Sequence, residues 1–325
     1  MINRSLLKKS IVESRMLLFA CVAALYAFCW ARVWIVSLFE MDRFKAIVEQ
    51  FREFERFSPV PFDQLFTYSG RIAMTFDEPV VVVSMCMWAI ARGSDCVSGE
   101  LGRGTMEMLL AQPVSRIQVL WSQALVTVGG VAVLAGASWL GIYTGIMTTS
   151  VKEAVPSATW TIPWIDIEIP NLLEADEEET VDVPMAFRVD PVDFVPASVN
   201  LLALGFFLAG LSSFFSSLDR YRWRTIGVVA GICVVEVIIK IIGLAADRLH
   251  WLGYFSFFSS YEPERFVNVA VRTPENTWSI ALYDAAGVFT GLGPLGYDLV
   301  LIGMGLAGYL AATYIFHARD LPAPL

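Results

Sequence analysis

Charged residues are scarce in this sequence. Asp, Glu, Lys and Arg make up 17% of its 325 residues, whereas soluble domains carry about a quarter. Apolar residues reach 56%, and the mean hydropathy is +0.59. A water-soluble protein of 36.0 kDa cannot hide such an excess in one core or break it into small surface patches. We therefore expect a protein that folds in a lipid bilayer.

Positive charge, histidine and catalytic motifs are also in short supply. The 23 basic residues against 32 acidic ones give a net charge of −9, so no basic field would gather nucleic acid. With only His250 and His317, and with neither HExxH nor GxSxG, we expect no metal site and no catalytic site. The cysteines all fall in or beside long apolar runs, so a disulfide framework is not indicated: Cys21, Cys29, Cys86, Cys96 and Cys233.

Six apolar runs are long enough to cross a bilayer as helices. They cover residues 16–39, 79–98, 121–147, 194–218, 225–246 and 299–317. The first is too long for the core of a signal peptide, so we expect an uncleaved anchor. The sequence thus predicts an all-α integral membrane protein, a single transmembrane domain over residues 1–325. Residues 250–261 and 285–297 are apolar but too short to cross, and are predicted to be interfacial or re-entrant.

The orientation follows from the placement of Lys and Arg. With a cytoplasmic N-terminus, basic residues gather in the short inner segments, and RYRWR at residues 220–224 is the densest cluster. The positive-inside rule then predicts a multi-pass protein of the plasma (inner) membrane with both termini in the cytoplasm.

Two segments outside the membrane carry recognisable patterns. Residues 40–57 place Phe and Ile at helical spacing, which predicts an amphipathic extension of the first span. Residues 148–193 form an acidic extracytoplasmic loop in which apolar and polar residues alternate, which predicts a small external loop domain with some β character. Its EADEEE turn could bind calcium or simply be solvated, and both readings remain open.

The most informative segment is the cytoplasmic stretch of residues 99–116. Gly102 and Gly104 break the incoming helix. Thr105 can then cap a short new helix, with Glu107 in its first turn favoured by the helix dipole. Pro113 ends this helix.

The short helix has one apolar face and is followed at once by another helix. Met106, Leu109 and Leu110 recur at i, i+3 and i+4, while residues 115–118 form a capping box from which a helix starts at Arg116. A helix of two turns is not stable alone in water. It must therefore dock against either the membrane surface or a groove in a partner protein.

The run SGELGRGTMEMLLAQPVSR resembles the cytoplasmic segment between spans two and three of ABC-2 type transporter permeases, the membrane subunits of ATP-driven exporters. That family has Gly-Glu, Gly-Thr, Leu-Leu and Pro-x-Ser-Arg in this order. The matching positions here are Gly99, Glu100, Gly104, Thr105, Leu109, Leu110, Pro113, Ser115 and Arg116.

The resemblance implies a coupling helix that fits a cleft in a separate ABC ATPase subunit. The residues it implies for this contact are Glu100, Arg103, Gly104, Thr105, Glu107, Leu109, Leu110, Pro113 and Arg116. The sequence has no G-x-x-x-x-G-K-[ST], so ATP and Mg²⁺ would bind the partner, and the chain itself would be a transport subunit rather than an enzyme.

The resemblance also implies export, contact with membrane lipid and a second permease subunit, in a homodimer or a heterodimer. An alternative is a membrane scaffold that transports nothing, whose acidic outer loop binds another protein and whose cytoplasmic helix lies on the lipid.

Two further patterns allow more than one interpretation. Glu236 and Lys240 lie four residues apart in the fifth span, where they could line a translocation pathway or form a self-satisfied pair that holds helices together. The pairs Gly141 with Gly145 and Gly227 with Gly231 permit close helix packing. We expect that packing within the subunit rather than at a dimer seam.

Overall fold

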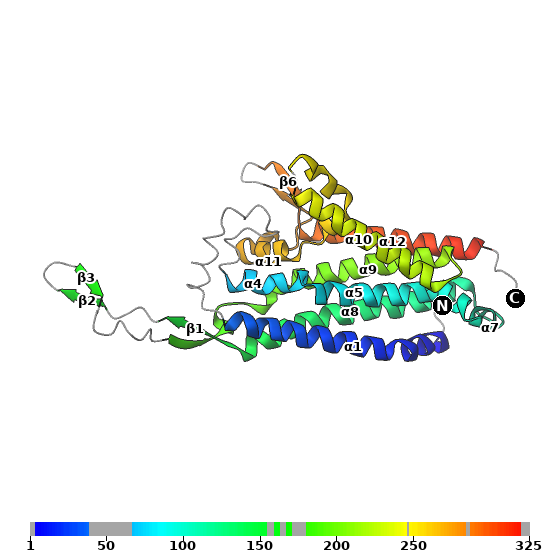
Figure 1. The fold of residues 1–325 in the computed structure, drawn as a ribbon, viewed down its shortest axis with the longest axis horizontal. Helices are drawn as coiled ribbons and strands as arrows, with labels where there is room; N and C mark the ends of the chain where they lie inside the picture. Colours follow the sequence, from blue (N-terminus) through cyan, green and yellow to red (C-terminus); the bar gives the residue numbers. More distant parts are fainter. Residues whose placement is uncertain are drawn as a thin grey trace.

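The computed structural model describes residues 4–38, 67–154, 159–162, 167–170, 180–245, 247–283 and 287–319. Within these residues six helical runs are long and apolar enough to cross a membrane (Figure 1). Four are single helices: α1 (Arg4–Ser37), α8 (Arg116–Thr148), α10 (Arg222–Ala245) and α12 (Pro294–Ala318). The fourth run consists of α9 (Val195–Leu218) and the short 3₁₀ turn that precedes it. The prediction of an all-α membrane protein with six transmembrane helices is confirmed.

The second crossing is a run of shorter helical pieces over Tyr68–Gly102. It comprises α4 (Tyr68–Ala73), the 3₁₀ turn η2 (Met74–Asp77), α5 (Pro79–Ser94), the π-helix η3 (Asp95–Gly99) and α6 (Glu100–Gly102). Pro79 occupies the first turn of α5, where its missing N–H has no intrahelical partner to lose. A π-turn inside a helix often marks a functional site, and this one leads directly into the predicted coupling segment.

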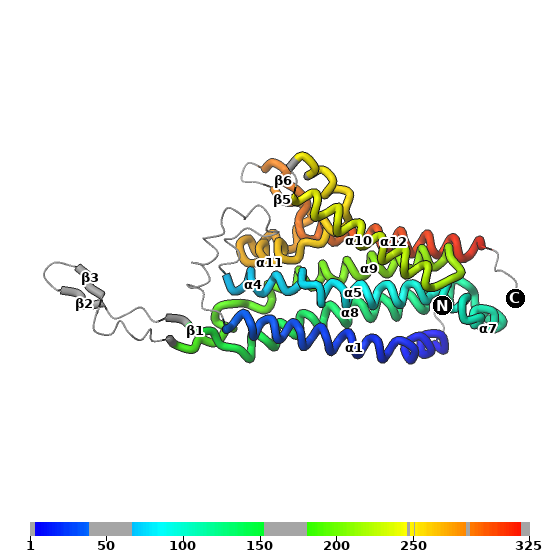
Figure 2. Tube along the Cα trace, in the orientation of Figure 1, coloured from blue at the N-terminus to red at the C-terminus, as the bar shows by residue number. Residues whose placement is uncertain are grey.

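Both chain ends lie at the same end of the bundle, together with the short helix α7 (Thr105–Leu110) (Figures 1 and 2). We call this the terminus end, and the opposite end, where α4 lies, the loop end.

The remaining helical elements are η4 (Met185–Phe187), η5 (Pro191–Phe194), η6 (Asp247–Phe255), η7 (Phe257–Ser260), α11 (Pro263–Arg272) and η8 (Pro274–Asn276).

The strands form three antiparallel pairs. Strand β1 (Ser150–Ala154) pairs with β4 (Thr180–Pro184), β2 (Thr159–Ile162) with β3 (Ile167–Pro170), and β5 (Ala281–Tyr283) with β6 (Phe289–Leu292). The first two pairs lie in the acidic loop, which therefore has the β character that its alternating pattern predicted.

Helix packing is closest where glycine removes the side chain. Along the bundle α12 packs on α9 and α1 on α8 (Figure 2). A Cβ at Gly308 would lie 2.8 Å from the backbone of Gly210, so α9 and α12 touch through their main chains. A Cβ at Gly141 would lie 2.6 Å from Tyr26 O, and one at Gly145 2.6 Å from Val33 Cβ. Gly141 and Gly145 thus pack within the subunit, as expected.

Helix α10 is packed differently. Its buried residues are only Thr225, Val229 and Gly243, and a Cβ at Gly227 or Gly231 would meet no atom within 4 Å. The expectation that Gly227 and Gly231 pack within the subunit is therefore wrong. The reason is that α10 leans on the bundle along a narrow strip and leaves its glycine face open.

Two other expectations need comment. Residues 285–297 do not form a re-entrant piece in the part described, because Phe289–Leu292 pairs with β5 and Pro294 already begins α12. The amphipathic helix expected over residues 40–57 and the EADEEE turn lie outside the described residues.

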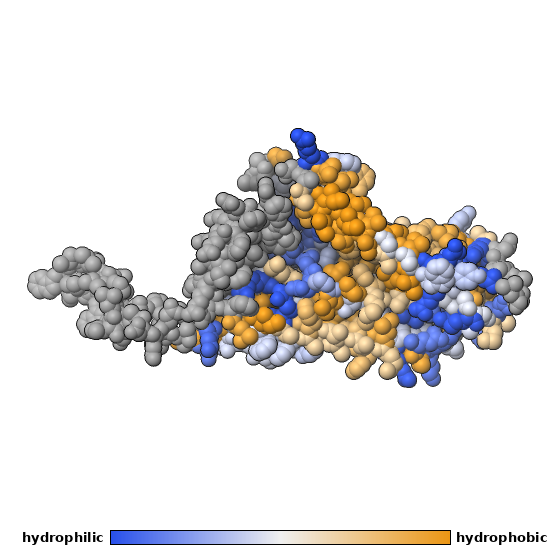
Figure 3. All heavy atoms as spheres, in the orientation of Figure 1, coloured by the Kyte–Doolittle hydropathy of each residue, from blue (hydrophilic) through white to orange (hydrophobic). Residues whose placement is uncertain are grey.

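Hydropathy separates the two parts of the bundle surface. On the face drawn in Figure 3, hydrophilic side chains gather at the terminus end, apolar side chains cover the middle of the bundle, and further hydrophilic side chains lie toward the loop end. Large apolar side chains of the crossing helices, such as Phe19, Val133 and Leu310, are exposed, as they would be against lipid tails.

Candidate functional site

The predicted coupling segment lies at the terminus end as a turn, a short helix and a capped restart. Gly104, with φ of 70°, is the N-cap of α7. Thr105 is the first helical residue instead, and its hydroxyl donates to the Glu100 carboxylate. The expected Thr105 cap is therefore replaced by a left-handed glycine, a conformation that residues with a Cβ resist.

The capping box before α8 is present as the sequence predicts. The Ser115 hydroxyl accepts from Gln118 N at 3.2 Å, and Ser115 N donates to Gln118 Oε1 at 3.0 Å. Together the left-handed turn and the capping box define both ends of α7.

The apolar face of α7 is buried in the protein's own core. Met106 is buried, and Leu109 is only 9% exposed. They share a cluster with residues from the neighbouring helices: Leu6, Cys96, Val97, Val119, Leu120, Ala312 and Phe316. Leu110 packs at the edge of the same cluster. Leu109 is therefore not available to anchor a partner, which differs from the sequence-based expectation.

The opposite face of α7 and its C-terminal turn are exposed. Met108 is 66% exposed, and Glu107 and residues 111–113 are exposed as well. Pro113 thus lies outward, as a contact residue must. We call Glu107, Met108 and residues 111–113 the outer face of α7.

Glu100 lies directly beneath this helix and is 0% exposed. Its carboxylate accepts from Lys9 Nζ at 2.9 and 3.1 Å and from Gln123 Nε2 at 3.3 Å, besides Thr105. Arg103 NH2 lies 3.3 Å away. Glu100 therefore joins α1, α8 and the start of α7 rather than reaching outward.

The carboxylate of Asp95, in the π-helix, forms ion pairs with three arginines. Its carboxylate lies 2.7 Å from Arg103 NH1, 3.4 Å from Arg222 NH1 and 3.5 Å from Arg92 NH1. Arg92 also donates to Ser10 of α1 at 2.7 Å. The hydrogen bond to Asp95 raises the pKa of the Arg103 guanidinium above its ordinary value, so the group stays charged. This cluster links α1, the second crossing and α10.

Arg116 caps the end of α12. Its NH1 group donates to Phe316 O at 3.3 Å and to His317 O at 3.4 Å, carbonyls that no longer have an intrahelical partner. In turn Arg319 NH1 donates to Ser217 O at 2.9 Å, at the end of α9. Arg116 is therefore an internal link between α8 and α12.

The π-helix is tied to α9 by hydroxyl groups. Ser216 Oγ accepts from Val97 N at 3.2 Å and from Ser98 N at 2.9 Å, and donates to Ser94 O at 2.9 Å. These bonds complete a set in which the terminus ends of α1, α8, α9, α10, α12 and the second crossing are all joined by polar contacts. We call this set the terminus-end network.

Glu236 and Lys240 hold η7 in place. Lys240 Nζ donates to Phe258 O at 2.9 Å and to Tyr261 O at 3.1 Å, and Glu236 accepts from Phe257 N at 3.3 Å. Within the described residues the structure shows no ion pair between the two. Each side chain thus fastens one end of η7 to α10, and neither needs a substrate to be satisfied.

The sequence identified this segment as a candidate contact but not its inner partners. Glu100, Thr105, Leu109 and Arg116 face inward, whereas Gly104, Glu107 and Pro113 are exposed. Arg103 is partly exposed, but its guanidinium pairs with the buried carboxylates of Asp95 and Glu100. The inner partners Lys9, Asp95, Gln123 and Arg222 were missed because they come from other helices. In the sequence, the only indication of these residues was a charged or amide side chain at the end of an apolar run.

A comparison with protein families bears on this segment. Residues 8–162 match the family described as ABC-2 family transporter protein. The matched range contains most of α1, the second crossing, α7 and α8, and hence Glu100 with the side chains that bind it. No curated protein matches the chain.

Proposed function

Because the chain belongs to the ABC-2 family of transporter proteins, we propose that it exports its substrate with energy from ATP that a separate subunit hydrolyses. Family membership makes it a multi-pass membrane permease, the transport component of an ABC transporter. In this proposal ATP and Mg²⁺ bind the partner, since the sequence has no phosphate-binding G-x-x-x-x-G-K-[ST] motif.

The observation that carries the proposal is the combination of an exposed face on α7 and the terminus-end network behind it. The outer face of α7 offers Met108 and Pro113 to a partner, while the inner face is packed on α1, α8 and α12. A displacement of the outer face is therefore transmitted to every crossing helix through packed side chains and charged hydrogen bonds. A helix that only lay on the lipid surface would not need these contacts with the crossing helices.

We propose that the permease lies in the plasma (inner) membrane with its terminus end in the cytoplasm. It is supported by the basic residues of that end, among them Lys9, Arg103 and Arg222, because cytoplasmic segments carry the excess of Lys and Arg. Both termini are then cytoplasmic, and ATP is available on the side where α7 is exposed.

The proposed mechanism is alternating access. Closure of the ATPase subunits on ATP moves α7, and Glu100 and Arg116 pass this displacement to α1, α8 and α12. The arginines around Asp95 pass it to α10. We expect the terminus end, whose helices this network joins, to move as a unit while the helices tilt about the glycine contacts between α9 and α12.

A second permease subunit completes the proposed transporter, as a homodimer or a heterodimer. Helix α10 supports this assembly, because its open face carries Gly227 and Gly231 together with exposed Val228, Val234 and Val235. Small residues four apart let two helices approach closely in a membrane.

Substitution of Met108 by Asp tests the ATPase contact. Met108→Asp places a charge on the outer face of α7 without touching the core, so we expect the permease to stay in the membrane and to lose its co-purifying ATPase subunit. The readout is vanadate-sensitive ATPase activity, and a chain with a Walker A motif, in the tagged permease purified from native membranes.

The matched control is Phe187→Asp, which changes another highly exposed apolar residue (79%, against 66% for Met108) at the loop end. This variant should retain the ATPase subunit. Equal retention by Met108→Asp and the unchanged protein would contradict the proposal and favour the scaffold interpretation.

A further inference from the structure

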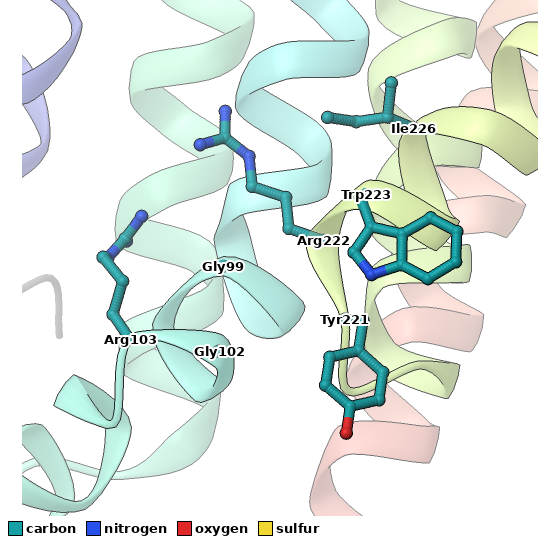
Figure 4. Close-up of a pocket in the computed structure, with 7 residues that line it drawn as sticks. All are labelled: Gly99, Gly102, Arg103, Tyr221, Arg222, Trp223 and Ile226. Atoms are coloured by element: carbon teal, nitrogen blue, oxygen red, sulfur yellow. The ribbon is translucent and has the colours of Figure 1, made fainter.

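A cavity of about 530 Å³ lies beside the terminus-end network (Figure 4). Gly99, Gly102 and Arg103 form one wall, and residues 221–223 with Ile226 form the opposite wall. The cavity thus separates the end of the second crossing from the start of α10. Gly102 leaves it open, because a Cβ there would meet only one atom within 4 Å, at 3.8 Å.

A second cavity of about 340 Å³ adjoins the same two arginines on the side of α1. Arg103 and Arg222 line both cavities. The charged residues around the two cavities are three arginines and two carboxylates, a positive excess of one in a protein of net charge −9.

Asp95 does not use up the hydrogen-bonding capacity of these arginines. It is one buried carboxylate shared by Arg92, Arg103 and Arg222. Arg103 also pairs with Glu100 at 3.3 Å, and Arg222 also donates to Ser94 Oγ at 3.4 Å and to Ala91 O at 3.0 Å. Each guanidinium carries five N–H donors, so both keep donors beyond these contacts. Both Arg103 and Arg222 remain partly exposed. The site therefore has positive charge and donors ready for a further anion.

The cavity also lies where the bilayer surface would be. The apolar part of α10 begins just after it, and Trp223, which is 72% exposed, and exposed Tyr221 flank its mouth. Tryptophan and tyrosine of membrane proteins concentrate at the headgroup level. Ile226 in the first cavity and Leu17 in the second mark the side that faces the acyl chains.

From these observations we infer that the cavity binds the phosphate of an anionic phospholipid headgroup, with Arg103 and Arg222 as its cationic ligands. Arginine binds phosphate through charge-assisted hydrogen bonds, and basic pockets between transmembrane helices take anionic headgroups. The lipid then bridges the start of α10 to the end of the second crossing, beside the contact that Arg222 already makes with Asp95.

The alternative occupant is an acidic segment of a protein partner, and the geometry disfavours it. None of the residues of the outer face of α7 lines the cavity, so a partner on that face would not reach the arginines directly. The wall formed by Trp223 and Ile226 instead opens toward the lipid-facing surface of α10.

Native mass spectrometry of the full-length permease in detergent tests this inference without any partner. Phosphatidylglycerol and phosphatidylethanolamine of equal chain length are added, and bound lipid is counted against concentration. We expect selective retention of phosphatidylglycerol. Arg222→Gln should weaken its binding about five-fold, the factor expected for one arginine near an anionic surface.

Two further variants separate the site from general charge and from misfolding. Gly102→Leu fills the cavity while it keeps every arginine, so it should also lose selective retention of phosphatidylglycerol. Arg224→Gln removes the same charge from the same turn of α10, but its exposed side chain faces Asp219 at 3.8 Å and does not line the cavity, so it should bind lipid as the unchanged protein does.

Three results would overturn the inference. One is equal retention of both lipids by the unchanged protein. Another is unaltered phosphatidylglycerol binding in Gly102→Leu. The third is displacement of the lipid by inorganic phosphate at matched concentration, which would identify a site for the free anion.

Discussion

Glu100 shows how one buried charge can organise the terminus end. A carboxylate with no exposed surface is costly unless it is paired, and here Lys9, Arg103, Thr105 and Gln123 all bind it. Each of these partners comes from a different turn or helix, so the charge is stable only when α1, α7 and α8 are correctly placed around it. A residue of this kind gives specificity to the arrangement as well as stability.

Neutralising Glu100 should therefore lower the stability of the protein. Glu100→Gln keeps the volume of the side chain but removes the charge that Lys9 and Arg103 share, so we expect a loss of about 1.5–3 kcal/mol, the range for hydrogen bonds to charged groups. Thermal unfolding in detergent measures the effect. Glu107→Gln is the matched control, because exposed Glu107 should change the free energy of unfolding by no more than about 0.5 kcal/mol. Identical unfolding temperatures for the two variants would show that Glu100 is not the organising charge.

At the scale of elements, α7 depends on the turn before it more than on its own sequence. Six residues are too few to form a stable helix in isolation. The helix persists because Gly104 reverses the chain and because Met106 and Leu109 reach the core. The apolar side chains that made the segment conspicuous thus serve its attachment to the subunit, while its exposed face remains for a partner.

A side chain at Gly104 should disturb α7 through the backbone alone. Gly104 has φ of 70° and no atoms within 4 Å of a built Cβ, so Gly104→Ala introduces no clash and only the cost of the left-handed conformation, about 1–2 kcal/mol. Gly129→Ala, in the middle of α8 and equally free of contacts, should instead be neutral or stabilising by up to about 1 kcal/mol. Thermal unfolding of the two variants side by side checks this expectation, which fails if both shift in the same direction.

At the scale of the whole molecule, the close packing of α9 against α12 holds the bundle together. Gly210, Gly305 and Gly308 bring the two backbones together, and in a membrane such van der Waals packing replaces the hydrophobic effect as a source of helix association. Helix α10, in contrast, has an open glycine face and leans on the bundle along a narrow strip. The molecule thus combines a tight central pair with one helix whose open face is the one that we propose for lipid and for a second subunit.

Separating α9 from α12 should disrupt the fold. A Cβ at Gly305 would lie 2.9 Å from the Phe207 backbone, whereas one at Gly303, on the same helix, meets nothing within 4 Å. We expect Gly305→Leu to cost about 3 kcal/mol or more, since the backbone itself must move, and Gly303→Leu to be tolerated. Size-exclusion chromatography and thermal unfolding distinguish the two. Equal behaviour would mean that the helices do not touch at this point.

The membrane class, the six crossings and the breaks that bound α7 were determined by the sequence alone. All three depend on local patterns: apolar runs of bilayer length, the glycines before Thr105, and the capping box after Pro113. Such patterns act between residues close in the chain, so they can be recognised without knowing how the helices are arranged.

Only the tertiary structure decided which face of α7 is free, what surrounds Glu100 and Asp95, and what Glu236 and Lys240 hold. Lys9 and Glu100 are 91 positions apart, and Arg116 and Phe316 are 200, so no local pattern could join them. The burial of Leu109 was hidden for the same reason. An apolar side chain looks the same in the sequence whether it packs on its own subunit or on another, and only the neighbouring helices determine which occurs.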